Sequence, residues 1–183
     1  PGSRLDKASI GIEEASYHLI LLARDESGYQ NLMKLVSIGY LEGFYYRPRI
    51  DMELLRQYKE GLICTTACLK GEVGYNFFTG QDEKAIRAIE RLRDLFGEDF
   101  YLEIQSNGIS EQEIANKKII EYARKNNVRL VATNDCHYMT AEDAMAQEVL
   151  MCIQTGKTLN DESRMKLTTN EFYFKSPEAM RQL

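Results

Sequence analysis

Asp135 and His137 are the pair of residues whose types and spacing most directly suggest chemistry. They follow residues 128–133, a run rich in branched apolar residues that predicts a buried strand with a polar far end. If the extended backbone continues through the pair, side chains two positions apart leave the chain on the same side. A carboxylate oxygen and an imidazole nitrogen in one space suit a divalent metal ion.

Two further candidate ligands flank other predicted strands. Cys68 lies just beyond the strand predicted at 62–66, where the active residues of α/β sheets and α/β barrels gather. His18 instead precedes the apolar run of the strand predicted at 17–23. It therefore joins the other candidates only if its strand runs in the opposite direction or the chain bends there.

Each candidate also has a plainer interpretation. Asp135 is suited to capping a turn, His137 to a hydrogen bond with the backbone, and Cys68 to packing as a small apolar residue. Glu103 and Gln105, on the alternating segment 100–105, either support the ligands or form a solvated face of a strand. The chain has only two histidines, and a mixed set of nitrogen, oxygen and sulfur donors suits zinc, manganese or iron.

The composition limits the class of protein. The 183 residues are enough for one domain with a sizeable core, and from this sequence we expect neither a signal peptide nor a membrane-spanning segment. With 23 Lys and Arg against 28 Asp and Glu, any contact with nucleic acid must be local or made by sequence outside this chain. The four cysteines are too sparse for a disulfide-rich secreted domain, and we expect Cys64, Cys136 and Cys152 to be packing residues in a reducing, cytoplasmic environment.

Strands and helices alternate along the chain, which predicts a parallel α/β sheet covered by helices. Besides the segments already named, helical spacing and capping residues predict helices at 29–40, 51–58, 71–79, 82–96, 111–125 and 140–156, and a short strand at 172–174. Residues 1–16 are predicted to form a loop. The expected sheet-facing side chains of the first helix are Tyr29, Leu32, Met33, Val36 and Tyr40.

Several blocks of this sequence resemble one family in their order along the chain and in their residues. They are SYHLILLA (16–23), GYQNL (28–32), FYYRPR (44–49), ACLKGEV (67–73), YLEIQ (101–105), ATNDCHY (132–138) and CIQTGK (152–157). The blocks extend over essentially the whole chain. They are similar to the amino-terminal polymerase and histidinol phosphatase (PHP) domain of bacterial replicative DNA polymerase III alpha subunits.

The resemblance implies a distorted β/α barrel of seven strand–helix units with a three-metal cluster at the strand ends. His18, Cys68, Asp135 and His137 match ligand positions of the family, whereas Asn107 stands where many relatives have histidine. The family's first strands, with a His-x-His motif and two further ligands, precede the PGSRLDK with which this chain begins. We therefore expect residues 1–183 to be a single partial PHP domain, truncated at both ends, that forms an open barrel.

The resemblance also implies a function for the parent protein. Polymerisation, with magnesium, belongs to a palm domain further along the family's sequence, so no catalytic residue for that reaction is expected here. The PHP domain resembles a metal-dependent phosphoesterase, which in some relatives is linked to 3′-5′ exonuclease proofreading and in others is a scaffold without metal. We expect this chain alone to bind metal weakly or not at all and to have negligible hydrolytic activity.

Other interpretations remain open at this point. The chain could be a stand-alone PHP phosphatase that acts on a small phosphomonoester, or a catalytically silent module that braces the polymerase. The expected partners are DNA and other replicase subunits, reached through the parent protein, with no membrane contact. Strand edges left exposed by absent units can pair with an edge of another copy of the chain. We therefore also expect that this fragment can dimerise through such an edge.

Overall fold

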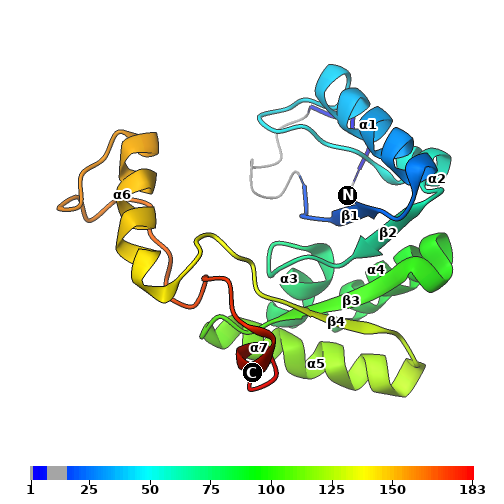
Figure 1. Ribbon diagram of the computed structural model, residues 1–183. Helices are drawn as coiled ribbons and strands as arrows, with labels where there is room; N and C mark the ends of the chain where they lie inside the picture. The colour runs from blue at the N-terminus through cyan, green and yellow to red at the C-terminus, as the bar shows by residue number, and fades with distance from the viewer. Residues whose placement is uncertain (1, 8–15) are drawn as a thin grey trace.

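The computed structural model describes residues 2–7 and 16–183. It has an α/β fold, in which helices pack around one mixed β-sheet (Figure 1). The strands are β1 (Ile20–Ala23), β2 (Leu62–Thr65), β3 (Phe100–Gln105) and β4 (Leu130–Thr133). The helices are α1 (Glu26–Leu41), α2 (Met52–Tyr58), α3 (Glu72–Phe78), α4 (Asp82–Phe96), α5 (Ser110–Asn126), α6 (Ala144–Thr155) and α7 (Pro177–Met180), with 3-10 turns at Gly97–Asp99 and Ala141–Asp143. Most of the loop predicted at 1–16 lies outside the described residues.

The described sheet has the strand order β1-β2-β3-β4 and is not closed. The pairs β2–β3 and β3–β4 are parallel, as predicted, but β1 runs antiparallel to β2. The start of β1 therefore lies beside the end of β2, so residues just before β1 share an edge of the sheet with residues just after β2. The α/β class and the open, partial barrel predicted for this chain agree with this sheet.

One hydrophobic core joins the sheet to α1, α2, α3, α4 and α5. Helix α4 contributes the face predicted from its spacing, and the four side chains of that face are all buried: Ala85, Ile89, Leu92 and Phe96. Asp82 and Glu83 in the first turn and Arg93 in the last turn complement the helix dipole. This helix behaves as its sequence period predicts, because one uninterrupted apolar stripe faces one large core.

The face predicted for α1 is only partly correct, because Leu32 packs against the core but the other four side chains of that face are exposed. Tyr29, Met33, Val36 and Tyr40 are between 40% and 58% exposed, whereas Leu35 is only 1% exposed. The helix approaches the turn before β2 through a glycine, since a Cβ atom added at Gly28 would lie 1.8 Å from the Gly61 carbonyl oxygen. This close contact between backbones sets the rotation of the helix and leaves the larger apolar side chains outside.

Both edge strands are more exposed than predicted. β4 was expected to be buried, but it forms an edge of the sheet and Leu130 is 37% exposed. β1 forms the other edge, with Leu22 at 52% exposed. An apolar run predicts a strand, but it does not distinguish a central strand from an edge strand.

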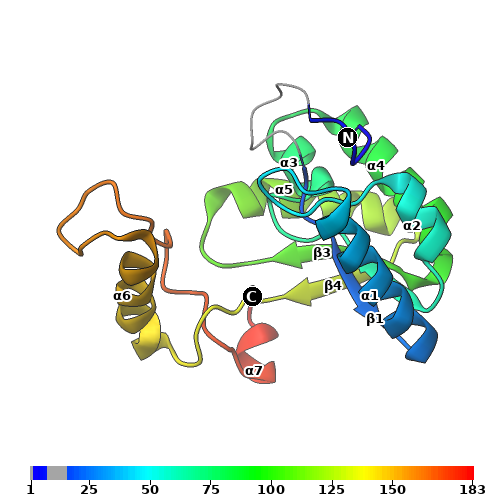
Figure 2. The same ribbon diagram turned by 90° about the horizontal axis from the view of Figure 1, so that it is seen from above.

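Helix α6 stands apart from the body of the molecule at the end of an arm (Figures 1 and 2). The arm leaves through a capping box in which Thr140 and Asp143 bond each other's backbone amides, and Gly156 ends the helix at φ +65°, both as predicted. The chain then returns to the sheet, where the strand predicted at 172–174 is a single bridge between Tyr138 and Tyr173. No helix within the described residues is both long and apolar enough to cross a membrane.

Candidate functional site

His18 and Cys68 meet at the edge of the sheet where β1 begins and β2 ends. The Nδ1 atom of His18 lies 3.6 Å from the Sγ atom of Cys68. The His18 amide donates a hydrogen bond of 2.9 Å to the Lys70 carbonyl, and His18 forms a parallel bridge with Gly71. The opposite direction of β1, one of the two conditions set by the sequence, is therefore met, and it brings His18 to the candidate site.

The turn that carries Cys68 depends on two unusual backbone positions. Ala67 has φ +59°, in the left-handed region that residues other than glycine rarely adopt. A Cβ atom added at Gly71 would lie 2.1 Å from the Thr66 carbonyl oxygen, so only glycine fits there. The chain consequently folds back within a few residues and directs the Cys68 thiol toward His18.

Burial and neighbouring charges perturb both side chains. Burial lowers the pKa of His18, the positive charges of Lys70 and Arg47 lower it further, and Asp135 opposes them. Burial raises the pKa of Cys68, and the negative charges of Asp135 and Glu103 act in the same direction against backbone hydrogen bonds. Each group therefore favours its neutral form, which for the imidazole is the form that ligates a metal.

Asp135 and His137 are close together, but not for the reason given by their spacing. β4 ends at Thr133, and Asp135 has φ +49°, so the extended backbone does not continue through the pair. The His137 Nε2 atom still lies 3.5 Å from the Asp135 Oδ1 atom. The expected strand-like geometry is wrong here, since a left-handed residue turns the chain immediately after the strand.

Asp135 and His137 differ in their relation to the cavity of about 540 Å³ beside β1 and β2. Asp135 lines this cavity together with His18 and Cys68, whereas His137 is not among its lining residues. His137 packs edge-on against the Phe172 ring at 5.5 Å, and its amide donates to the Phe172 carbonyl at 2.8 Å. Three of the four candidate ligands thus share one cavity, and the fourth contacts Asp135.

The donor types fit a borderline divalent metal, but their number and placement do not. Imidazole, thiol and carboxylate are ligands that zinc and related ions accept. Within residues 2–7 and 16–183, however, no group of three or more His, Cys, Asp or Glu residues is placed to hold one ion. The described residues form two donor pairs, His18 with Cys68 and Asp135 with His137. By themselves they do not make a complete metal site.

Glu103 and Gln105 form a buried polar ladder beneath these donors. Glu103 is 2% exposed, and its carboxylate accepts hydrogen bonds from the hydroxyl groups of Thr65 on β2 and Thr133 on β4. The Gln105 side chain donates to the same carboxylate at 3.0 Å, and the Glu103 amide donates to the Thr66 hydroxyl at 2.9 Å. The alternative of a solvated face is therefore wrong for this pair, whose side chains link three neighbouring strands.

Asn107, fully buried, connects the ladder to the returning tail. Its side-chain amide donates to the carbonyl groups of Asn134 and Glu171, at 2.9 and 3.1 Å, and its Oδ1 atom accepts from Gln112 at 3.0 Å. The Thr169 hydroxyl donates to the Asn107 carbonyl. The side-chain amide of Asn107 thus holds the tail beside the post-β4 segment.

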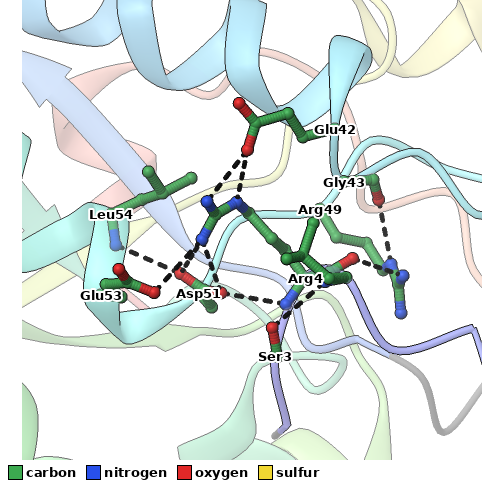
Figure 3. Close-up of polar contacts among 9 residues, drawn as sticks. Ser3, Arg4, Glu42, Gly43, Arg49, Asp51, Glu53 and Leu54 are labelled. Carbon is green, nitrogen blue, oxygen red and sulfur yellow. Dashed lines mark hydrogen bonds and ion pairs between the residues drawn. The ribbon is translucent and has the colours of Figure 1, made fainter.

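Arg4 and Arg49 line the cavity, and a network of ion pairs and hydrogen bonds holds them (Figure 3). Arg4 pairs with Asp51 at 3.1 Å and with Glu42 at 2.9 Å, and its backbone amide donates to Asp51. Arg49 donates to the carbonyl groups of Gly43 and Arg4. These contacts tie the segment 2–6 to the loop between α1 and α2.

The sequence interpretation missed these arginines and the two threonines. Thr65 and Thr133 stand at the ends of β2 and β4, and two strands that both end in threonine are the signal that could have indicated the ladder. Arg47 and Arg49 lie in the FYYRPR block. Two arginines around a proline in a loop of aromatic residues are the signal that could have indicated a cationic wall.

The cysteines were predicted correctly in two cases out of three. Cys64 is fully buried and Cys152 nearly so, as expected of packing residues. Burial raises the pKa of Cys64 to about 12. Cys136 is exposed, because the chain turns away from the core directly after β4, so the packing role predicted for it is wrong.

Comparison with known proteins gives a consistent answer. A DNA polymerase III subunit alpha from Borreliella burgdorferi is 50% identical over 181 residues, which cover 99% of this chain. The subunits of the same name from Aquifex aeolicus and Treponema pallidum are 46% and 45% identical over 98% and 100% of this chain. The chain spans 16% of the length of each of these relatives. A family model described as the PHP domain matches residues 4–107, and the chain therefore belongs to the PHP domain family.

Proposed function

We propose that this chain is part of the alpha subunit of a bacterial DNA polymerase III, a DNA-directed DNA polymerase of chromosome replication. The observation that carries this proposal is the sequence identity of 44% to 50% to subunits of that name, over 98% to 99% of this chain. The polymerase reaction and its magnesium would belong to other parts of the protein. DNA and other replicase subunits would be reached through the complete protein, in the cytoplasm.

We further propose that the cavity is part of a phosphoesterase site of the 3′-5′ exonuclease type, with His18, Cys68, Asp135 and His137 among its metal ligands. The shared cavity and the 3.6 Å contact between His18 and Cys68 support this role. Divalent ions, zinc, manganese or iron, would supply the Lewis acid in the complete domain. Because the described donors occur only in pairs, this chain by itself should bind metal weakly or not at all and hydrolyse little.

A second candidate is a scaffold module without chemistry, and the lack of a three-donor group among the described residues favours it. The stand-alone phosphatase is less well supported, since the relatives that match are named alpha subunits. Both alternatives agree with membership of the PHP domain family.

Two measurements test these proposals. The complete reading frame should contain a His-x-His segment before residue 1 and a palm domain with paired aspartates after residue 183, and a frame without the palm would contradict the polymerase proposal. Exonuclease activity and metal content should then be measured on the complete protein and on its Asp135→Asn and His137→Ala variants. If the complete protein contains no metal and both variants keep polymerase function, the scaffold role is correct.

A further inference from the structure

Four arginines line the cavity, and three of them are already engaged. Arg4 is paired with Asp51 and Glu42, and Arg91 is paired with Glu72 at 2.6 Å. Arg49 bonds carbonyl groups, and its guanidinium stacks over the Tyr45 ring at 5.2 Å. These three arginines hold the wall together, Arg4 and Arg91 through ion pairs and Arg49 through bonds to carbonyl groups.

Arg47 is different. Within the described part of the chain, its guanidinium makes no hydrogen bond and no ion pair, although it lines the same cavity as His18, Cys68 and Asp135. It is also near enough to His18 for its charge to disfavour protonation of the imidazole. An uncompensated guanidinium on the wall of a cavity is a site for an anion.

The backbone presents Arg47 in a defined way. Tyr46 has φ +58°, and the Tyr45 amide donates to the Arg47 carbonyl at 3.0 Å, so the chain makes a tight turn just before the arginine. The Tyr45 and Tyr46 rings pack edge-on with centroids 4.6 Å apart, and Pro48 follows at once. This turn fixes the backbone position from which the exposed Arg47 side chain reaches the cavity.

We propose that Arg47 binds the phosphate group of a phosphoester in this cavity, with its guanidinium contacting two phosphate oxygens. A planar guanidinium matches phosphate in shape as well as charge, which a lysine does not. The inference rests on the proposed function for the class of ligand, but it requires no metal. It adds a substrate-binding residue to a site otherwise defined by its candidate metal ligands.

The test is a titration of the chain with inorganic phosphate in metal-free buffer at constant ionic strength, followed by the broadening of the phosphorus NMR line. Arg47→Gln should weaken phosphate binding about tenfold or more, and Arg47→Lys should weaken it by less. Arg87→Gln is the matched control, because Arg87 on α4 is exposed and lies outside the cavity. It should leave phosphate binding unchanged.

Three results would overturn the inference: no phosphate binding by the unaltered chain, equal binding by the unaltered chain and Arg47→Gln, or an equal loss in Arg87→Gln. Urea unfolding of each variant verifies that the fold is retained. Cobalt binding to Cys68, measured separately in the complete protein, tests the metal proposal. Loss of phosphate binding in Arg47→Gln without any cobalt–thiolate band would support the inference and contradict the metal proposal. Unchanged phosphate binding in Arg47→Gln together with a cobalt–thiolate band would contradict the inference and support the metal proposal.

Discussion

The imidazole of His18 lies 3.6 Å from the thiol of Cys68, although fifty positions separate the two residues in the chain. The antiparallel direction of β1 produces this contact, because it brings the start of that strand to the end of β2. The 66–71 turn then completes the approach through the bridge between His18 and Gly71. A cavity beside the sheet thereby receives donors from segments far apart in the sequence.

Replacing Asp51 tests the network that closes one wall of the cavity. Partial burial works to raise the pKa of Asp51, but hydrogen bonds from the Arg4 and Leu54 amides and from the Arg4 guanidinium outweigh it and lower the pKa below 3.8. A lowered pKa stabilises the folded state at pH values above 3.8, and this contribution is lost as the pH falls through the folded-state value. Asp51→Asn keeps an N-cap for α2 but removes the charge.

We expect Asp51→Asn to lower the free energy of unfolding by about 1 kcal/mol at pH 7. The difference from the unaltered chain should shrink below pH 3.8, where Asp51 of the unaltered chain is protonated in the unfolded state. Urea unfolding from pH 3 to pH 7 measures both effects, with the exposed Asp94→Asn as control. A difference that is constant with pH would show that the charge of Asp51 does not stabilise the fold.

The buried ladder gives a second prediction. Glu103→Ala leaves the donors of Thr65, Thr133 and Gln105 without their shared acceptor and should destabilise the chain by about 3 kcal/mol. Glu103→Gln keeps one acceptor oxygen and should be less harmful. Urea unfolding of both variants, with the exposed Glu113→Ala as control, gives the comparison. A solvated or dispensable Glu103 would make all three variants equal.

Asn107 gives a third prediction, on local stability. Asn107→Ala removes the bonds to the Asn134 and Glu171 carbonyl groups and should release the tail from the post-β4 segment. Hydrogen exchange at the Phe174 amide, which bonds the Tyr138 carbonyl at 3.1 Å, should then become faster. Protection unchanged at this amide would mean that the tail is held by other contacts. The exposed Asn170→Ala is the control within the same tail.

The exposed edge of β1 gives a fourth prediction, which concerns the proposed fragment dimer. If the chain pairs through this edge, Leu22→Lys should weaken its self-association, because a lysine on an edge strand opposes pairing. Leu41→Lys is a suitable control, since Leu41 is 85% exposed but lies on α1. Sedimentation over a range of concentrations measures the effect. A chain that remains monomeric, or a dimer equally sensitive to both changes, would exclude pairing through this edge.

The sequence predicted the elements better than it predicted their surroundings. The helix at 82–96 was predicted with its bounds and its buried face, because its apolar period is regular and its core is local. The exposed edge strands and the rotation of α1 were missed, since burial depends on which segments lie alongside in space. The Gly28–Gly61 contact, which sets the rotation of α1, is between backbones and leaves no apolar pattern.

The candidate site was predicted in its residue types but not in its geometry. Spacing alone left the direction of the strand after His18 open. The antiparallel direction of that strand is what brings His18 to the candidate site. The spacing of Asp135 and His137 assumed an extended backbone, which a left-handed residue interrupts. The uncompensated Arg47 could not be recognised from the sequence, because its significance depends on the partners that its neighbouring arginines find in space.

The most direct test of the account is a cobalt titration of the complete protein, with the thiolate-to-cobalt absorption band as the signal. Cys136 lies between Asp135 and His137 but its thiol is directed toward the Tyr173 carbonyl, so Cys136→Ser is a control from the candidate site itself. We expect a band that is lost in Cys68→Ser, reduced in His18→Ala and kept in Cys136→Ser. A band that survives in Cys68→Ser, or no band at all, would contradict the assignment of Cys68 and His18 as ligands of one metal.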